Sequence, residues 1–178
     1  RAAAVPGTAV VDGQRSTRIF SPISSGGGLY VALAGLHLTG GDPGGTSRGG
    51  AIKIDGAAQR VHLELTACTI TECSAYDGGV LSISNGAQNV IVTFTACNIT
   101  GNTANHEGGV AFIEGGEVRF DSCTVSGNSV SVSIYESWLQ AGGVASIHSG
   151  GLVRFDSCTV SGNSITTDYA AGGVAFTR

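Results

Sequence analysis

The chain repeats a Gly-Gly pair at intervals close to 30 residues, and this period limits its possible folds more than any other feature. Successive pairs are separated by 29, 30, 34 and 30 residues, and they begin at Gly49, Gly78, Gly108, Gly142 and Gly172. Residues 118–129 and 153–164 are identical in sequence. Such internal identity is typical of repeat proteins, in which copies of one small unit stack on each other.

Each unit contains three short segments in which apolar and polar residues alternate. In one unit the alternating pairs are Leu81 and Ile83, Val92 and Phe94, and Cys97 and Ile99. A period of two indicates β-strands, and no stretch sustains the 3.6-residue apolar stripe of a helix. The sequence therefore predicts an all-β fold, a right-handed parallel β-helix with three short strands per coil, about 30 residues per coil and about six coils.

We expect one domain, a single β-helix segment over residues 1–178, in which residues 1–28 form a degenerate first coil and residues 29–178 form the repeat coils. Residues 33–39 align with the strand around Cys68 and contain Leu36 at the Cys position. The last Gly-Gly pair opens a strand without a cap, and solenoid ends need covering. We therefore expect a fragment of a longer chain, with further coils or other protein subunits at both ends.

The composition limits the classes of partner. Nine Lys and Arg stand against thirteen Asp and Glu, which gives a net charge of -4 and no basic face for nucleic acid. No window approaches the roughly 20 apolar residues of a membrane-spanning helix. We expect no nucleic-acid partner, no membrane insertion by this segment and no cofactor.

Stacking in register converts each repeated position into a column of side chains, and one column contains Cys68, Cys97, Cys123 and Cys158. We interpret it as a row of buried free thiols at one corner of the coil. Cα atoms about 4.8 Å apart would lie within the disulfide range, but parallel side chains disfavour the bond. Both states stay open, and the lack of His at ligand spacing disfavours zinc.

A second column contains Asn102, Asn128 and Asn163, each of which follows a Gly. Asn tolerates turn conformations, and its amide can bond to neighbouring backbone. The sequence predicts an inward ladder of hydrogen-bonded Asn side chains. Cys73 occupies the same position in an earlier coil.

The third segment presents two outward columns of mostly hydroxyl side chains. They are Thr69, Asn98, Thr124 and Thr159, followed by Thr71, Thr100, Ser126 and Ser161. Regular hydroxyl rows resemble the faces of ice-binding solenoids, although Thr and Ser are also ordinary outward strand residues. Asn98 begins an Asn-Ile-Thr sequon and is a possible glycosylation site.

Two features suggest contacts with a partner. The outward column of the first segment contains Phe112 and Phe176, which we expect to be exposed. Variable loops between the third segment and the next Gly-Gly pair should emerge along one edge, where a rigid scaffold can present them. The candidate partner contacts are Tyr135, Trp138, His106, Tyr169, Phe112 and Phe176.

The units resemble a known family. Gly49-Gly-Ala-Ile52 and the later Gly-Gly-Val units alternate with Phe-x-x-Cys, which is similar to the repeats of chlamydial polymorphic outer-membrane proteins and related right-handed β-helix repeat proteins. Those bacterial repeats usually have Phe-x-x-Asn in place of Phe-x-x-Cys. The resemblance implies an extracellular cell-surface location and a rod that serves in adhesion or in a surface filament, with loops for protein or glycan contacts.

Two alternatives belong to other classes. The same fold hosts pectate-lyase-like enzymes, which need converging carboxylates. Asp77, Glu107 and Asp168 would have to meet in one groove to support that alternative. Because outward acidic residues are sparse, we expect no enzyme and no catalytic or metal-binding residues. The second alternative is an ice-binding solenoid.

Overall fold

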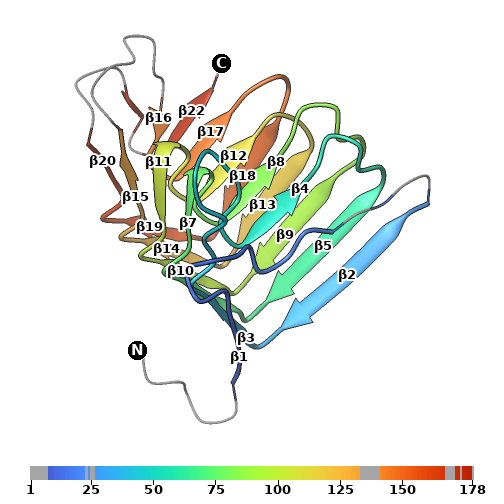
Figure 1. The fold of residues 1–178 in the computed structure, drawn as a ribbon, viewed down its shortest axis with the longest axis horizontal. Helices are drawn as coiled ribbons and strands as arrows, with labels where there is room; N and C mark the ends of the chain where they lie inside the picture. Colours follow the sequence, from blue (N-terminus) through green and yellow to red (C-terminus); the bar gives the residue numbers. More distant parts are fainter. Residues whose placement is uncertain are drawn as a thin grey trace.

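The computed structural model describes residues 8–22, 24, 27–132, 141–166, 171–172 and 174–177, and these ranges contain strands and turns but no helix. Strands at equivalent repeat positions pair in parallel and stack as a β-solenoid with roughly 30 residues per turn (Figure 1). The predicted parallel β-helix is therefore confirmed. The solenoid has about four turns rather than six, because the outermost strands of some sheets belong to incomplete turns.

Three sheets correspond to the three predicted segments. The first consists of β4 (Ile52–Ile54), β8 (Leu81–Ile83), β12 (Ala111–Ile113), β17 (Ala145–Ile147) and β22 (Ala175–Thr177). The second consists of β2 (Leu29–Ala34), β5 (Val61–Thr66), β9 (Ile91–Thr95), β13 (Glu117–Asp121) and β18 (Leu152–Asp156). The third consists of β1 (Ala9–Asp12), β3 (Leu36–Thr39), β6 (Thr69–Thr71), β10 (Asn98–Thr100), β14 (Thr124–Ser126) and β19 (Thr159–Ser161).

A fourth sheet occupies the segments that we predicted as variable loops. It consists of β7 (Ser74–Asp77), β11 (Thr103–Glu107), β15 (Ser129–Ser131) and β20 (Ser164–Thr166). The pair β16 (Ala141–Gly142) and β21 (Ala171–Gly172) adds a small ladder beyond it. The fourth sheet escaped prediction because it buries few apolar side chains. Ala104 and Val130 form its own small cluster, with Val132 and Ile165 packed against them.

The predicted inward residues of the first three sheets form one narrow core. At its centre the rings of Phe94, Phe120 and Phe155 stack in successive turns, with centroids 4.9 and 4.8 Å apart and planes within 8° of parallel. Phe94 and Phe120 are fully buried. The β5 ladder extends back to β2, where Leu33 pairs with Leu65, so the coil that precedes the first Gly-Gly pair continues the same register.

The Gly-Gly pairs make the turn from the fourth sheet to the first. The first Gly has a left-handed backbone in the pairs that begin at Gly49, Gly78 and Gly108, with φ of +66° at Gly78, which is easily adopted only by Gly. The second Gly is closely approached by other turns. A Cβ on Gly79 would lie 2.4 Å from the Gly109 carbonyl oxygen and 2.7 Å from that of Thr103. The repeat therefore needs Gly at both positions.

Candidate functional site

The three Asn side chains lie in one column at the corner between the third and fourth sheets. Asn102 and Asn128 are fully buried, and Asn163 is half-buried. The Asn128 amide donates to the Ile99 carbonyl at 3.0 Å. Its Oδ1 accepts from the backbone N–H and the side-chain amide of Asn102 at 3.0 and 2.9 Å. The backbone hydrogen bonds between strands are interrupted at this corner, and each Asn side chain replaces them. Its bonds also join successive turns.

The four Cys lie at the other corner, between the second and third sheets, as free thiols. Their sulfurs make contacts equivalent to those of the Asn amides. The Cys123 Sγ accepts the backbone N–H of Cys97 at 3.4 Å and lies 3.3 Å from the Phe94 carbonyl oxygen. Cys73 lies on the Asn column, where its N–H donates to Asn102 Oδ1 at 3.0 Å. Cys and Asn side chains therefore have the same role, because both bond to backbone N–H and carbonyl groups at a corner of the coil.

Thiols that are neighbours in the column shift one another's pKa. Hydrogen bonding with the Cys97 thiol lowers the pKa of Cys68 to about 6 and that of Cys123 to about 7. The contacts with Cys123 and then with Cys68 raise the pKa of Cys97 itself. By contrast, burial raises the pKa of Cys73 to about 12. The column is therefore a set of interacting thiols, whereas Cys73 is a separate one.

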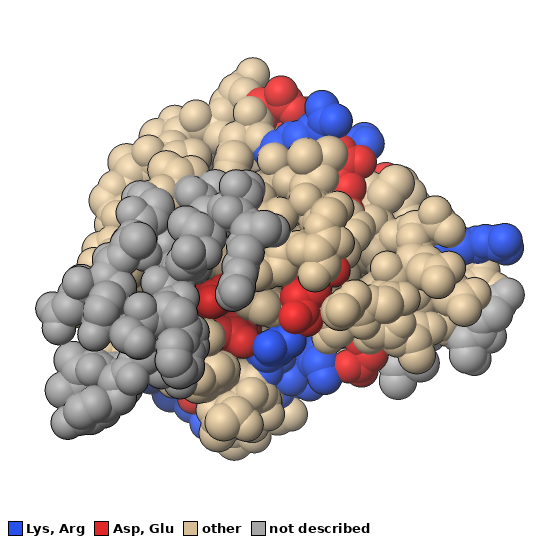
Figure 2. Space-filling view, turned by 90° about the horizontal axis from the view of Figure 1, so that it is seen from above, with Lys and Arg blue, Asp and Glu red and all other residues tan. Residues whose placement is uncertain are grey.

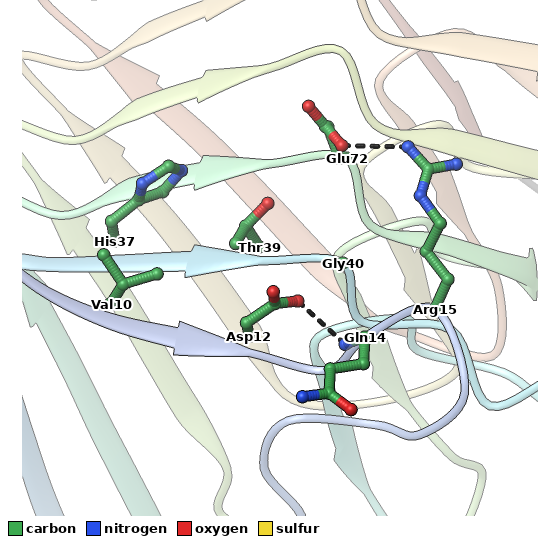
Figure 3. Close-up of a pocket in the computed structure, with 8 residues that line it drawn as sticks. All are labelled: Val10, Asp12, Gln14, Arg15, His37, Thr39, Gly40 and Glu72. Atoms are coloured by element: carbon green, nitrogen blue, oxygen red, sulfur yellow. Dashed lines mark hydrogen bonds and ion pairs between the residues drawn. The ribbon is translucent and has the colours of Figure 1, made fainter. Parts of the chain in front are cut away.

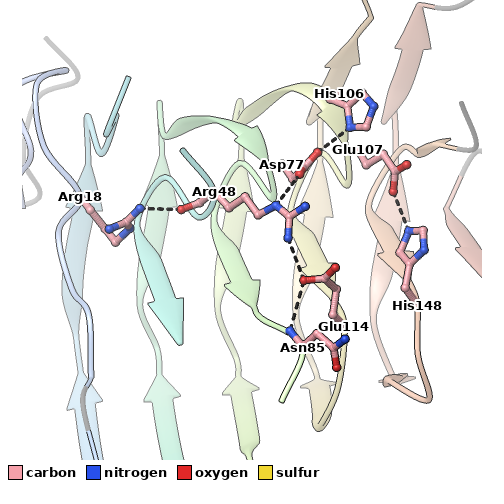
Figure 4. Close-up of polar contacts among 8 residues, drawn as sticks. All are labelled: Arg18, Arg48, Asp77, Asn85, His106, Glu107, Glu114 and His148. Atoms are coloured by element: carbon pink, nitrogen blue, oxygen red, sulfur yellow. Dashed lines mark hydrogen bonds and ion pairs between the residues drawn. The ribbon is translucent and has the colours of Figure 1, made fainter. Parts of the chain in front are cut away.

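A network of charged side chains lies where the fourth sheet meets the first (Figure 4). The Arg48 guanidinium pairs with Asp77 at 2.8 Å and with Glu114 at 2.7 Å. Asp77 is 1% exposed, and its second oxygen lies 2.8 Å from Nδ1 of His106. Arg18 donates to the Arg48 carbonyl at 2.7 Å. Figure 2 shows acidic and basic side chains gathered next to one another on this side of the molecule.

A second carboxylate–imidazole pair lies one turn further along. Glu107 is the strand partner of Asp77, and its carboxylate lies 2.6 Å from Nε2 of His148. Burial raises the pKa of the Glu107 carboxyl, and the contact with His148 opposes this shift only in part. The two carboxylates are thus adjacent, but both are occupied by protein partners.

The prediction that Phe112 is exposed is wrong, because its side chain is 4% exposed. The Arg48 guanidinium lies 4.6 Å from the ring centroid, and the His148 ring is 5.2 Å away. The turns from the fourth sheet to the first cover this column, since Ser82 and Ser146 are also fully buried and the Gly142 N–H donates to the Ser146 hydroxyl at 2.9 Å. We treated that segment as a loop, so this cover was missed.

The other candidate contacts have different positions. His106 lies in the charged network and stacks on Tyr76, with ring centroids 4.8 Å apart. Tyr135, Trp138 and Tyr169 lie outside the described residues, as does Asp168. Phe176 belongs to β22, but its side chain is also outside the described part.

The hydroxyl columns follow the outer face of the third sheet in register. Asn98 pairs with Thr69 and Thr124, and Thr100 pairs with Thr71 and Ser126. A third column on the fourth sheet, which the sequence analysis missed, contains Ser74, Thr103, Ser129 and Ser164. The side chain of Asn98 is exposed, as a glycosylation site requires.

A polar groove of about 630 Å³ opens on the same face beside β1 and β3 (Figure 3). Arg15 and Glu72 form an ion pair of 2.8 Å across it, and Asp12 and His37 also line it. The volume is typical of small-ligand sites, which combine few polar groups with apolar walls, whereas this lining is mainly polar. The sequence contains one signal for it, because Glu72 stands where later turns have Gly101, Gly127 and Gly162.

Comparisons with protein family models, with curated proteins and with solved structures find no match for this chain. No described segment forms a helix long and apolar enough to cross a membrane. The geometry defines the class of protein as a parallel β-solenoid. Since one fold hosts many functions, the function has to be argued from these surfaces.

Proposed function

We propose that the chain is a structural and adhesive β-helix rod of an extracellular cell-surface protein or filament, with one edge that contacts proteins or glycans. The observation that carries the proposal is the repetition of the same contacts between turns. Successive turns continue the corner hydrogen bonds and the parallel strand pairs, and three turns stack Phe94, Phe120 and Phe155 in one column. Length and stiffness can therefore increase by adding turns, with no need for a cofactor.

The charged network supports a structural role over a hydrolytic one. A polysaccharide-active enzyme needs two carboxylates that reach the substrate. Asp77 is held by Arg48 and His106, and Glu107, whose side chain is 10% exposed, is held by His148. These acidic side chains join segments of different turns instead of facing an open cleft.

Two surfaces are proposed for partner contacts. The edge formed by the fourth sheet and its flanking segments contains His106, and its sequence also supplies Tyr135, Trp138 and Tyr169. The groove at Arg15 and Glu72 offers charged and hydroxyl groups suited to a polar ligand such as a glycan. Partners stacked on the ends of the solenoid, and glycosylation of Asn98, remain predictions from the sequence.

The location is tested by labelling intact cells with an antibody raised against the chain, without permeabilisation. The contacts are tested by the adhesion of beads coated with the chain. The beads are pulled from immobilised neutral and acidic polysaccharides and from the cell surface. Glu72→Gly removes a groove carboxylate and restores the residue of the later turns, so the fold should persist while glycan adhesion falls. The paired substitution Tyr135→Ser and Trp138→Ser should reduce protein-dependent adhesion.

Thr124→Ala, on the exposed hydroxyl face, is the matched control and should leave adhesion unchanged. Absence of surface labelling would remove the extracellular proposal. Equal adhesion by wild type, the groove variant and the edge variant would show that neither surface makes the proposed contacts.

A second candidate is ice binding, which the three registered hydroxyl columns favour. Thermal hysteresis, measured as the gap between melting and freezing of a single ice crystal, should then appear and should fall when Thr124→Tyr interrupts the face. A zero gap for the wild-type chain removes this candidate.

A further inference from the structure

Within the described part of the chain, the Cys column is the only repeated row of sulfur atoms. Cys68, Cys97 and Cys123 are buried, and Cys158 is half-buried. Because the flanking strands are in register, successive sulfurs follow the turn spacing of about 4.8 Å. Each inner thiol thus has another thiol on either side along the solenoid.

The two inner thiols, those of Cys97 and Cys123, lie against backbone carbonyl oxygens to which they donate in the reduced, metal-free column. The Cys97 Sγ lies 3.3 Å from the Leu65 carbonyl oxygen and 3.4 Å from that of Thr95. The Cys123 Sγ lies 3.3 Å from two further carbonyl oxygens, those of Phe94 and Asp121. These oxygens would repel an isolated negative charge, but they would stabilise a positive ion held between the sulfurs.

The arrangement also selects the type of cation. Among the described residues, no three His, Cys, Asp or Glu side chains converge as a metal site. Zinc, which takes four ligands in a tetrahedron, therefore does not fit. A row of thiols offers two sulfurs on opposite sides of each gap, and thiolates select soft ions such as Cu(I).

We propose that the Cys column binds soft monovalent cations, Cu(I) or Ag(I), with one two-coordinate ion in each gap between successive thiols. Four thiols leave three gaps. Filling them binds three cations and releases four protons, which leaves one net negative charge on the column. Cys97 and Cys123 bridge two cations each, and the terminal thiols bind one each. The half-buried Cys158 provides the entry point, because it is the most accessible of the four thiols.

The test is a titration of the folded, reduced chain with Ag(I) in chloride-free buffer, with bound metal measured after dialysis. We expect three Ag(I) per wild-type chain and an increase in thermal midpoint, because a ligand that binds the folded state stabilises it. Cu(I), added under nitrogen as an acetonitrile complex, should compete with Ag(I), whereas Zn(II) should not.

Substitutions test whether the number of bound Ag(I) ions follows the gaps in the column or only the number of thiols. Cys97→Ser breaks two gaps and should leave one Ag(I), whereas Cys158→Ser and Cys68→Leu each break one and should leave two. Leu at position 68 reproduces Leu36 of the preceding turn, so that variant should fold even if Cys97→Ser does not. Cys73→Ser removes a buried thiol from the Asn column and should still bind three.

Three results would overturn the proposal. Loss of Ag(I) in Cys73→Ser, or retention of three in Cys68→Leu and Cys158→Ser, would show that binding does not follow the gaps. Loss of the β-sheet circular dichroism signal on titration would show that Ag(I) binds unfolded chains. Thiols are also counted after the protein has been isolated without reductant and then denatured. Fewer than five reactive thiols would show that the column is oxidised to disulfide instead.

Discussion

Replacing Asn128 tests the physical role of the corner columns. In Asn128→Ala the backbone N–H of Asn102 loses its acceptor at 3.0 Å, and the Ile99 carbonyl loses a donor at 3.0 Å. Both bonds are buried. An unsatisfied buried polar group costs about 1 to 3 kcal/mol, so the variant should lose about 2 to 6 kcal/mol of unfolding free energy. That is a large share of the roughly 5 to 15 kcal/mol of a typical domain.

Asn128→Cys provides the matched comparison, because the other corner shows how a thiol fits. The Cys123 Sγ accepts a backbone N–H at 3.4 Å and lies 3.3 Å from a carbonyl of the preceding turn. We expect Asn128→Cys to cost about 1 to 2 kcal/mol, since its bonds are weaker but both partners remain satisfied. Urea unfolding followed by circular dichroism measures both variants. Equal losses for Ala and Cys, or a loss below about 1 kcal/mol for Ala, would refute the hydrogen-bonding argument.

Three further substitutions test other parts of the structure by the same unfolding assay. Gly79→Ala should cost at least about 3 kcal/mol, because its Cβ would lie 2.4 Å from a backbone oxygen. Gly127→Ala, with open space and φ of +62°, should cost about 1 to 2 kcal/mol. Phe120→Ala should cost about 3 to 5 kcal/mol, because the ring is fully buried between two others. A milder effect of Gly79→Ala than of Gly127→Ala, or a loss below about 1 kcal/mol for Phe120→Ala, would contradict the packing described. Burial, with a smaller contribution from the Asp77 charge, raises the pKa of Glu107, and His148 and His106 oppose this shift only in part, so the folded state holds this proton more tightly than the unfolded chain. Its contribution to stability is therefore lost as pH rises above the ordinary carboxyl range, and Glu107→Gln should gain stability relative to wild type as pH rises from about 4. A stability difference between Glu107→Gln and wild type that stays constant as pH rises would contradict this predicted direction.

The repeat period and the alternation were sufficient to predict three of the four main sheets. Those segments place two apolar residues in the core of each turn, as Val92 and Phe94 do in β9, so their period of two is strong. The fourth sheet buries small or single side chains such as Ala104, and its alternation is too weak to separate from a loop. The error about Phe112 follows from this, because the missed segment is the one that covers it.

The charged network depends on contacts that no local pattern encodes. Arg48 precedes β4, whereas its partners Asp77 and Glu114 come from two later turns. From the sequence, His106 is predicted only as a loop contact and Asp77 only as a carboxylate of the enzyme alternative, so neither is assigned its partner in the network. Register, which follows from the repeat, was predictable, but the rotamers that bring charges from three turns together were not.

Every column of side chains described above requires turns that stack in register, so that each repeated position lies above its equivalent in the next turn. Spin labels attached at positions 98 and 124, on the exposed face and in a Cys158→Ser background, test this most directly by continuous-wave electron paramagnetic resonance. Because Asn98 and Thr124 are strand partners in adjacent turns, we expect strong dipolar broadening for this pair. Labels at 98 and 159, two turns apart, should broaden less. Equal spectra for the two pairs, or spectra equal to the sum of single labels, would contradict the stacked solenoid.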